Sequence, residues 1–153
     1  MKFLVVDDSS FTQIMTSNLL KKFFPNGDII TARDGFEGLE KYKEAKPDYI
    51  FVDLLMPKLN GIELIKKIKE CDKDAKIFVI TADVQKSIKE ETETLDIKAF
   101  ISKPFNEDKG KYVFNIIKEE HCSATRGILH CYSGSVEMAR EFIKLGFYIS
   151  LGG

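Results

Sequence analysis

Short apolar runs alternate with longer amphipathic segments five times along the first part of this chain. The runs are rich in β-branched and aromatic residues and occupy residues 3–6, 29–32, 49–52, 77–80 and 99–102. Runs of this length and composition predict strands that are buried on both faces, with helices between them. Regular strand–helix alternation is typical of a parallel sheet covered by helices on both sides, because parallel strands need long crossover connections.

Five strand–helix units favour an α/β fold of the flavodoxin-like type, a (βα)5 arrangement whose parallel sheet has the strand order 2-1-3-4-5. The segment from residue 86 to 93 is very polar and predicts the weakest of the five helices. The first helix carries apolar residues at helical spacing, and we expect this face to be buried: Phe11, Ile14, Met15, Leu19 and Phe23.

Three acids follow strands that this order makes neighbours. Asp7 and Asp8 come directly after the first strand, and Asp53 comes after the third. Carboxylates that meet in one pocket repel, at a cost on the order of 4 kcal/mol for a pair ~4 Å apart in an effective dielectric constant of about 20. Mg²⁺ prefers such oxygen ligands and typically bridges one or two carboxylates to a phosphate oxygen. The pattern therefore predicts a magnesium site that works on a phosphorylated donor.

Two further strand ends carry groups that phosphoryl transfer requires. Thr81 offers a hydroxyl to one phosphoryl oxygen, and Lys103 offers a positive charge to another. Asp53 supplies the nucleophile. Each of these residue types is common alone as a helix cap or a surface charge. Their occurrence together at four strand ends indicates a functional site.

These motifs together resemble the receiver domain of bacterial response regulators, most closely the stand-alone chemotaxis type. The resemblance covers residues 1 to about 119. It rests on the following motifs in order: Val6-Asp7-Asp8-Ser9, Asp34-Gly35, Val52-Asp53 with Met56-Pro57 and Asn60-Gly61, Thr81-Ala82, and Lys103-Pro104-Phe105.

The resemblance implies a role for each site residue. Asp53 would accept a phosphoryl group from a histidine kinase, and Thr81 and Lys103 would contact that group. The metal ligands that it implies for Mg²⁺ are Asp7, Asp8, Asp53 and the main chain of Leu55. Phe100 matches the aromatic switch residue of the family, and the bond before Pro104 is expected to be cis. The output partner is expected on the face formed by the fourth helix, the fifth strand and the fifth helix.

Two other classes of protein with related folds fit the motifs less well. A flavin-binding electron carrier needs a loop rich in Ser, Thr and Gly after the first strand, where this chain has Asp7 and Asp8. A phosphatase of the haloacid dehalogenase type needs a second acid two residues after its nucleophile, and that position is Leu55. Neither alternative is favoured.

The composition points to a protein of the cytoplasm. The chain has 44% hydrophobic residues, 31% charged residues and a formal net charge of −1, so no global basic character attracts nucleic acid or a membrane surface. Its three cysteines have no metal-type spacing and indicate a reducing compartment. No apolar stretch approaches the ~18 residues that a membrane helix needs.

The tail does not resemble a receiver. A strand, a helix and a strand are predicted between residues 127 and 153, after a linker at 121–126, so that the receiver domain would span 1–120. The stretch resembles a βαβ fragment of a TatD-type metal-dependent hydrolase, a TIM-barrel family. The resemblance rests on Leu129-His130-Cys131-Tyr132-Ser133-Gly134, Glu137-Met138-Ala139, Leu145-Gly146-Phe147-Tyr148-Ile149 and Gly152-Gly153.

No hydrolase activity is expected from this fragment. His130 matches a metal ligand of that family, but a catalytic zinc-type site needs about three protein ligands and the others are missing from the sequence. One helix is also too little for a helix-turn-helix, so DNA binding has no support. We therefore expect no productive metal binding at His130.

The sequence leaves two questions open. The tail either extends the chain's own sheet, giving a monomer, or exchanges with a second chain to give a domain-swapped dimer. A strand at residues 128–131 that paired beside the fifth strand would cover part of the output face. Because the barrel-like piece stops short, the alternative to a chemotaxis-type regulator is an engineered chimera of receiver and TIM-barrel fragment, with an inherited acidic site and no signalling role.

Overall fold

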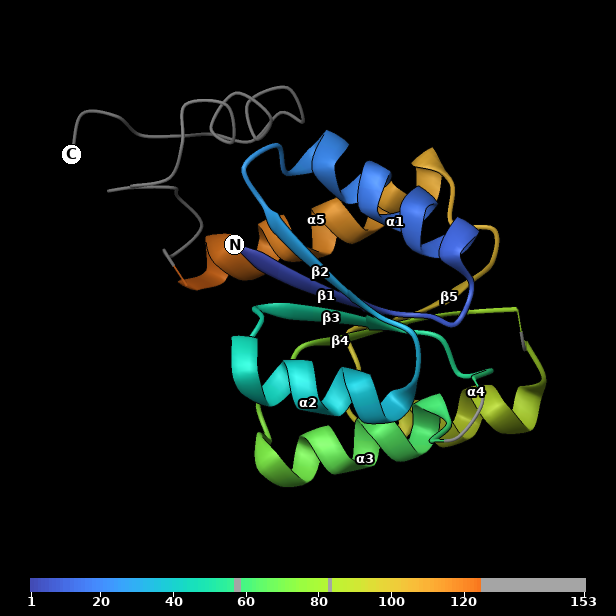
Figure 1. The fold of residues 1–153 in the computed structure, drawn as a ribbon. Coiled ribbons are helices and arrows are strands. Elements are labelled where there is room, and N and C mark those ends of the chain that lie inside the picture. The colour runs from blue at the N-terminus through green and yellow to red at the C-terminus, as the bar shows by residue number, and fades with distance from the viewer. Residues whose placement is uncertain (57–58, 83, 125–153) are drawn as a thin grey trace, which may run out of the picture.

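The computed structural model describes residues 1–56, 59–82 and 84–124 (Figure 1). Within these residues strands and helices alternate, as the sequence predicts. The strands are β1 (Lys2–Val6), β2 (Asp28–Ala32), β3 (Tyr49–Val52), β4 (Ile77–Thr81) and β5 (Ala99–Ser102). The helices are α1 (Ser10–Phe23), α2 (Gly35–Ala45), α3 (Gly61–Cys71), α4 (Lys86–Glu93) and α5 (Glu107–Ala124).

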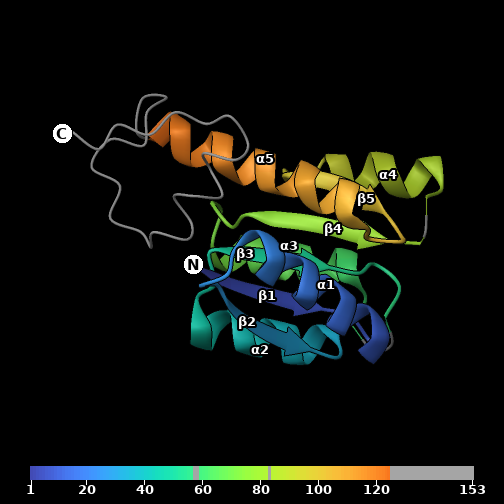
Figure 2. The same cartoon turned by 90° about the horizontal axis from the view of Figure 1, so that it is seen from above.

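All strands belong to one parallel sheet with the order β2-β1-β3-β4-β5, which confirms the expected flavodoxin-like topology (Figure 2). The central pairing is that of β1 with β3, in which Val6 lies opposite Val52. On its other side Val6 lies opposite Ala32 of β2. The carboxyl ends of these three strands therefore reach the same edge of the sheet side by side.

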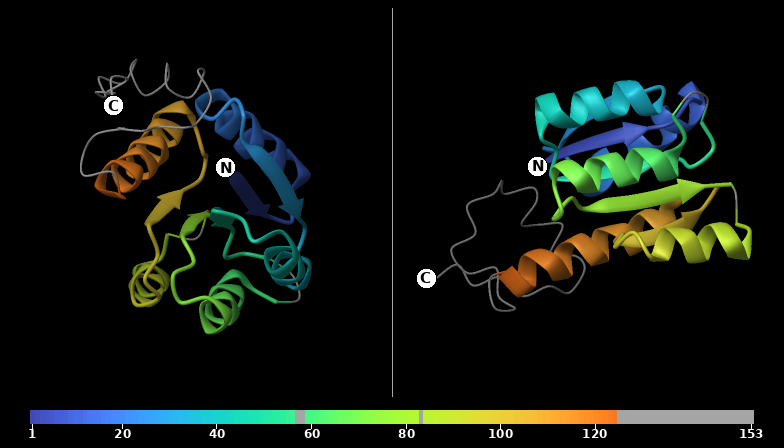
Figure 3. Two further views of the ribbon diagram at one scale, coloured as in Figure 1. Left: turned by 90° about the vertical axis from the view of Figure 1, so that its left-hand side faces the viewer. Right: turned by 90° about the horizontal axis from the view of Figure 1, so that it is seen from below.

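The sheet separates two hydrophobic cores of different composition. Helices α1 and α5 cover one face, and α2, α3 and α4 cover the other (Figure 3). Because successive residues of a strand point to opposite faces, Phe3 and Tyr49 lie on the α1/α5 side, whereas Leu4 and Ile50 lie on the α2/α3 side. The first core is largely aromatic and the second largely aliphatic. The buried aromatic residues of the first core are Phe3, Phe24, Tyr49, Phe51, Phe78, Phe105 and Phe114.

Side chains at four helix starts bind the first amides of their helices. Each accepts a hydrogen bond from the third residue after it, and the capping residues of α1, α2, α3 and α5 are Ser9, Asp34, Asn60 and Asn106. At α4, Gln85 makes no such cap hydrogen bond. This helix spans only 8 residues, which agrees with its low predicted stability.

The predicted buried face of α1 is wrong in its first half. Phe11 and Ile14 are 70% and 60% exposed, and the buried residues of the helix are Thr16 and Leu20, with Leu19 and Phe23 partly buried. Phe11 belongs to the first turn, which begins beyond the end of β1, so no strand lies beneath it to bury the ring. It borders instead a groove of about 290 Å³ beside Lys103 and Pro104.

The tail predictions lie outside the described residues. They comprise the last two residues of the linker predicted at 121–126, the βαβ fragment predicted at 127–153, and His130. The first four residues of that linker belong to α5. In the part of the chain that the structure covers, none of the helices has the length and apolar character needed to span a membrane.

Candidate functional site

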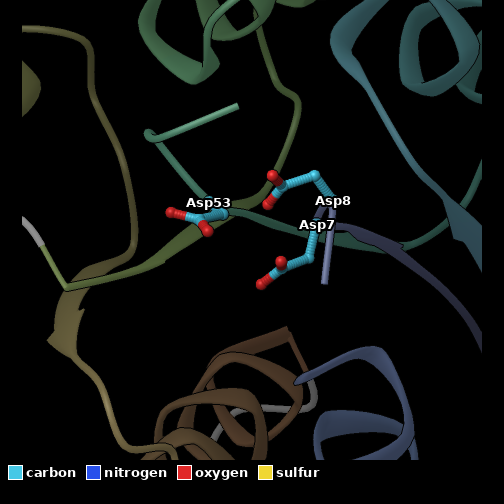
Figure 4. A group of neighbouring side chains, drawn as sticks. All are labelled: Asp7, Asp8 and Asp53. Carbon is cyan, nitrogen blue, oxygen red and sulfur yellow. The ribbon is translucent and has the colours of Figure 1, made fainter. Parts of the chain in front are cut away.

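Strand register brings the three predicted acids together. The amide of Asp53 donates to the carbonyl of Val6 at 2.9 Å, and the amide of Asp7 donates to the carbonyl of Ala32 at 3.0 Å. These bonds continue the β3–β1 and β1–β2 pairing past the last strand residues. As a result Asp7, Asp8 and Asp53 each place a carboxylate oxygen within 4.8 Å of the others (Figure 4).

Two of the three carboxylates are buried and held by main-chain amides. Asp7 and Asp53 are 3% and 4% exposed, whereas Asp8 is exposed. One oxygen of Asp7 accepts from the amide of Ser9 at 2.8 Å, and one oxygen of Asp53 accepts from the amide of Leu55 at 3.1 Å. Each buried acid thus has a fixed orientation, with its second oxygen turned to a shared partner.

That shared partner is Lys103. Its ammonium nitrogen lies 2.8 Å from the Asp53 carboxylate and 3.0 Å from that of Asp7. Burial alone would lower the pKa of Lys103, but its hydrogen bonds to Asp53 and Asp7 outweigh burial and hold the pKa above its ordinary value. The peptide bond between Lys103 and Pro104 is cis, as the resemblance led us to expect.

This arrangement shifts the pKa of Asp7. Burial raises its pKa above the ordinary value, and the negative charge of Asp53 adds to the rise. The Ser9 amide and Lys103 act in the opposite direction without cancelling it. One ammonium therefore does not fully compensate the carboxylates at this strand edge.

Thr81 and Phe100 lie on the paired strands β4 and β5, where Thr81 is opposite Ser102 and not Phe100. Thr81 is the last residue of β4 and is fully buried, and its carbonyl accepts from the amide of Lys103 at 2.8 Å. Phe100 lies opposite Val79 and packs, partly buried, against the aliphatic core on the side of α2, α3 and α4. Its ring therefore lies on the face of the sheet that α2, α3 and α4 cover, opposite α1 and α5.

The close fit of Gly61 against the end of β3 is a feature that the sequence interpretation missed. A Cβ at this position would lie 2.4 Å from the carbonyl oxygen of Asp53 and 2.6 Å from the Cα of Leu54. Both are main-chain atoms and cannot move aside. Asn60-Gly61 belongs to the motifs that carry the resemblance, but only the folded packing reveals that glycine is required for α3 to approach Asp53.

The donor set of this site fits Mg²⁺. Three carboxylates converge, two of them buried, and carboxylate oxygens are the hard ligands that Mg²⁺ prefers. The main chain of Leu55, two residues after Asp53, already bonds the Asp53 carboxylate through its amide. A bound cation would also lower the pKa of Asp7, which burial and, to a smaller extent, the charge of Asp53 raise.

Comparison with known proteins shows the family. Residues 3–115 match the model of the response regulator receiver domain. The chain therefore belongs to the family of response regulator receiver domains. Residues 106–153 match a second model, that of the TatD related DNase, and this match begins at the residue before α5.

Curated relatives and solved structures agree with this assignment. The chemotaxis protein CheY of Thermotoga maritima is 40% identical over 106 residues, which cover 68% of this chain and 86% of the relative. CheY of Bacillus subtilis is 36% identical over 110 residues, covering 71% of this chain and 89% of the relative. A crystal structure titled as the CheX-CheY-BeF3-Mg+2 complex from Borrelia burgdorferi superimposes with a TM-score of 0.70 at 30% identity, covering 79% of this chain and 89% of that chain.

Proposed function

We propose that this protein is a chemotaxis-type regulator of two-component signalling, located in the cytoplasm, in which Asp53 accepts a phosphoryl group from a histidine kinase in the presence of Mg²⁺. The observation that carries the proposal is the buried Asp53 carboxylate, 2.8 Å from the Lys103 ammonium and within 4.8 Å of the Asp7 and Asp8 carboxylates. Receiver family membership and the CheY relatives support it.

Each residue has a defined part in the transfer. An oxygen of Asp53 forms the new O–P bond while the N–P bond of the donor phosphohistidine breaks, and the electron pair and a proton go to the imidazole. Asp7, Asp8, Asp53 and the Leu55 main chain would hold Mg²⁺, which supplies positive charge to the phosphoryl oxygens. Lys103 and the Thr81 hydroxyl contact the remaining phosphoryl oxygens. Phe100 responds to Thr81 as the switch residue.

Phosphorylation by a small donor tests the chemistry. Incubation with acetyl phosphate and Mg²⁺ should add the mass of one phosphoryl group, and the gain should vanish with EDTA or in Asp53→Asn. The matched control is Asp74→Asn, which exchanges an exposed acid for an amide on the loop before β4 and should leave phosphorylation intact. Phosphorylation of Asp53→Asn at the wild-type level would refute the proposal.

The output partner is proposed to bind the face of α4, β5 and α5, and we propose that residues 125–153 cover part of it. Binding of a receiver-partner peptide to the full chain and to a chain ending at Ala124 tests this. The shorter chain should bind more tightly, with unchanged phosphorylation. Equal affinities would rule out a covering role for the tail.

One observation favours a second candidate, a receiver joined to a hydrolase fragment without a signalling role. It is the match of residues 106–153 to the TatD related DNase model. A kinase assay separates the candidates, because an acidic site that is merely inherited reacts with acetyl phosphate but with no histidine kinase of the source cell. No hydrolase activity is proposed for either candidate.

A further inference from the structure

We infer that Gln13 is a positioning residue for the metal site, because its side-chain amide holds the Asp7–Asp8 peptide in the orientation that directs the Asp8 carboxylate toward Asp7 and Asp53. The inference deepens the proposed function and rests on its Mg²⁺ site. Its basis is a pair of hydrogen bonds from one nitrogen. Nε2 of Gln13 donates to the carbonyl of Asp7 at 2.6 Å and to the carbonyl of Ala32 at 3.1 Å.

The chemistry of the contacts fixes which way the Gln13 amide faces. A side-chain amide nitrogen carries two hydrogens and can therefore serve two acceptors. Both partners are carbonyl oxygens, which cannot donate a hydrogen bond. If the amide were reversed, its own oxygen would face these two oxygens and be repelled by them. The nitrogen must face the strand ends.

Helix geometry explains how Gln13 reaches them. Ser9 caps α1, and the amide of Gln13 donates to the carbonyl of Ser9 at 3.0 Å, which places this residue at the first full turn of the helix. Helical side chains lean toward the amino terminus of their helix. Here that direction leads back over the loop to the ends of β1 and β2.

The bonds immobilise the main chain on both sides of Asp7. Its amide donates to the carbonyl of Ala32, and its own carbonyl accepts from Gln13. Because a peptide unit is planar, fixing the carbonyl of Asp7 also fixes the plane in which the nitrogen and Cα of Asp8 lie. The direction of the Asp8 side chain follows from that plane.

Asp8 needs this support more than its neighbours do. The carboxylates of Asp7 and Asp53 are buried and bonded to main-chain amides and to Lys103. Asp8 is exposed, and no hydrogen bond or ion pair found between described residues involves its carboxylate. Its place in the cluster therefore depends on the main chain, and the main chain depends on Gln13.

The test compares two replacements of similar length. Gln13→Met keeps the shape and loses both donors, and it should weaken Mg²⁺ binding about 10-fold, the usual effect of removing a group that orients a metal ligand. Gln13→Lys keeps an N–H donor but adds a positive charge that competes with Mg²⁺, and its affinity should come within about two-fold of the wild type in the same buffer once added KCl screens that charge, whereas the loss in Gln13→Met should remain. Calorimetric titration with MgCl₂ alone measures all three proteins.

Phosphorylation kinetics add a readout that mere destabilisation would not give. The Mg²⁺ concentration for half-maximal reaction with acetyl phosphate should rise in Gln13→Met, while the rate at saturating Mg²⁺ stays within about two-fold of the wild type. Thermal unfolding checks that the variant is folded. If it is not, Gln13→Ala, which favours helix and also lacks the donors, replaces it in the same titration.

The outcomes distinguish a failure of the positioning role of Gln13 from a failure of the proposed function. Equal Mg²⁺ affinity of wild type and Gln13→Met overturns the positioning role and leaves the proposed function standing. A loss in Gln13→Lys that stays equal to that in Gln13→Met at high salt also overturns it, because the donor would not be what matters. A wild-type protein that binds no Mg²⁺ refutes the metal site itself.

Discussion

At the scale of single residues, the three acids of the site differ in burial and in the partners of their carboxylates. Asp7 and Asp53 are buried and share the ammonium of Lys103, whereas Asp8 is exposed. In the absence of metal, Asp8 therefore adds negative charge to a cluster that one lysine already fails to compensate. Two predictions follow from this imbalance.

Asp8→Asn should stabilise the metal-free protein and weaken Mg²⁺ binding. The gain should be about 1 kcal/mol, the Coulomb energy of charges ~4 Å apart in a water-like dielectric. Urea unfolding in EDTA measures the stability, and titration with MgCl₂ measures the affinity. Asp74→Asn, an exposed acid on the loop before β4, is the control that should change neither. A less stable Asp8→Asn protein would contradict the repulsion argument.

Metal-free Asp7→Asn should gain stability over the wild type as the pH rises. The folded-state pKa of Asp7 lies above its ordinary value of 3.8, so the folded protein holds this proton more tightly than the unfolded chain does. That contribution is complete below pH 3.8 and is lost as the pH rises through the folded-state pKa. The asparagine has no such proton to lose. Unfolding in EDTA between about pH 4 and pH 8 measures the difference, and parallel stability curves would contradict the raised pKa.

Sequence reasoning reached the acids and Lys103 because strand ends in a parallel sheet share one edge. Residue type and strand position were then sufficient. It did not reach Gln13 or the tight packing of Gly61, since each depends on what lies opposite in space. The amide of Gln13 acts on the main chain of Asp7, and Gly61 matters because the main chain of Asp53 passes 2.4 Å from the place of its absent Cβ.

At the scale of elements, helices set how closely loops approach the site. The periodicity of α1 predicted a helix correctly but assigned the wrong residues of its first turns to the core. Phe11 and Ile14 fit the helical spacing, yet the helix turns Thr16 and Leu20 to the core, and Ile14, two residues from Thr16, lies on nearly the opposite side. Periodicity reports which residues share a face, and only the packing partner decides how much of that face is covered.

Gly61→Ala should destabilise the protein by about 2 kcal/mol or more and slow phosphorylation of Asp53. The added methyl group meets the main chain of Asp53 and Leu54, so α3 must move away and displace Asp53. Urea unfolding and the acetyl phosphate reaction measure the two effects. Gly110→Ala in α5 is the control, because its methyl group would meet mainly the edge of the Phe23 ring. Equal effects at both positions would contradict the role of the close approach.

At the scale of the whole molecule, both hydrophobic cores consist of residues from Phe3 to Ile117. Beyond these cores, Glu120 near the end of α5 makes polar contacts with other parts of the molecule. Glu120 accepts from the hydroxyl of Tyr49 at 2.7 Å and pairs with Lys98 at 2.7 Å. Burial opposes ionisation of Glu120, but Lys98 and Tyr49 outweigh burial and hold its pKa below the ordinary value.

A chain ending at Ala124 should therefore remain a stable monomer, with a free energy of unfolding within about 0.5 kcal/mol of the full chain. A chain ending at Lys118 should lose about 1–3 kcal/mol more, because the buried hydroxyl of Tyr49 loses its acceptor. Urea unfolding and solution mass compare the three chains. A large loss in the Ala124 chain would indicate that residues 125–153 contribute to the core, and a full chain of doubled mass would indicate exchange between two copies.

The bridge from Lys103 to Asp7 and Asp53 gives this molecule a tethered counterion of its own. An incoming divalent ion meets acids that are already partly neutralised, so its measured affinity is the difference between two competing cations and not the full attraction of the carboxylates. Because the ammonium cannot diffuse away, phosphorylation of Asp53 as proposed would leave it close enough to pair with the phosphoryl oxygens. The side chain that weakens metal binding would then stabilise the phosphorylated product.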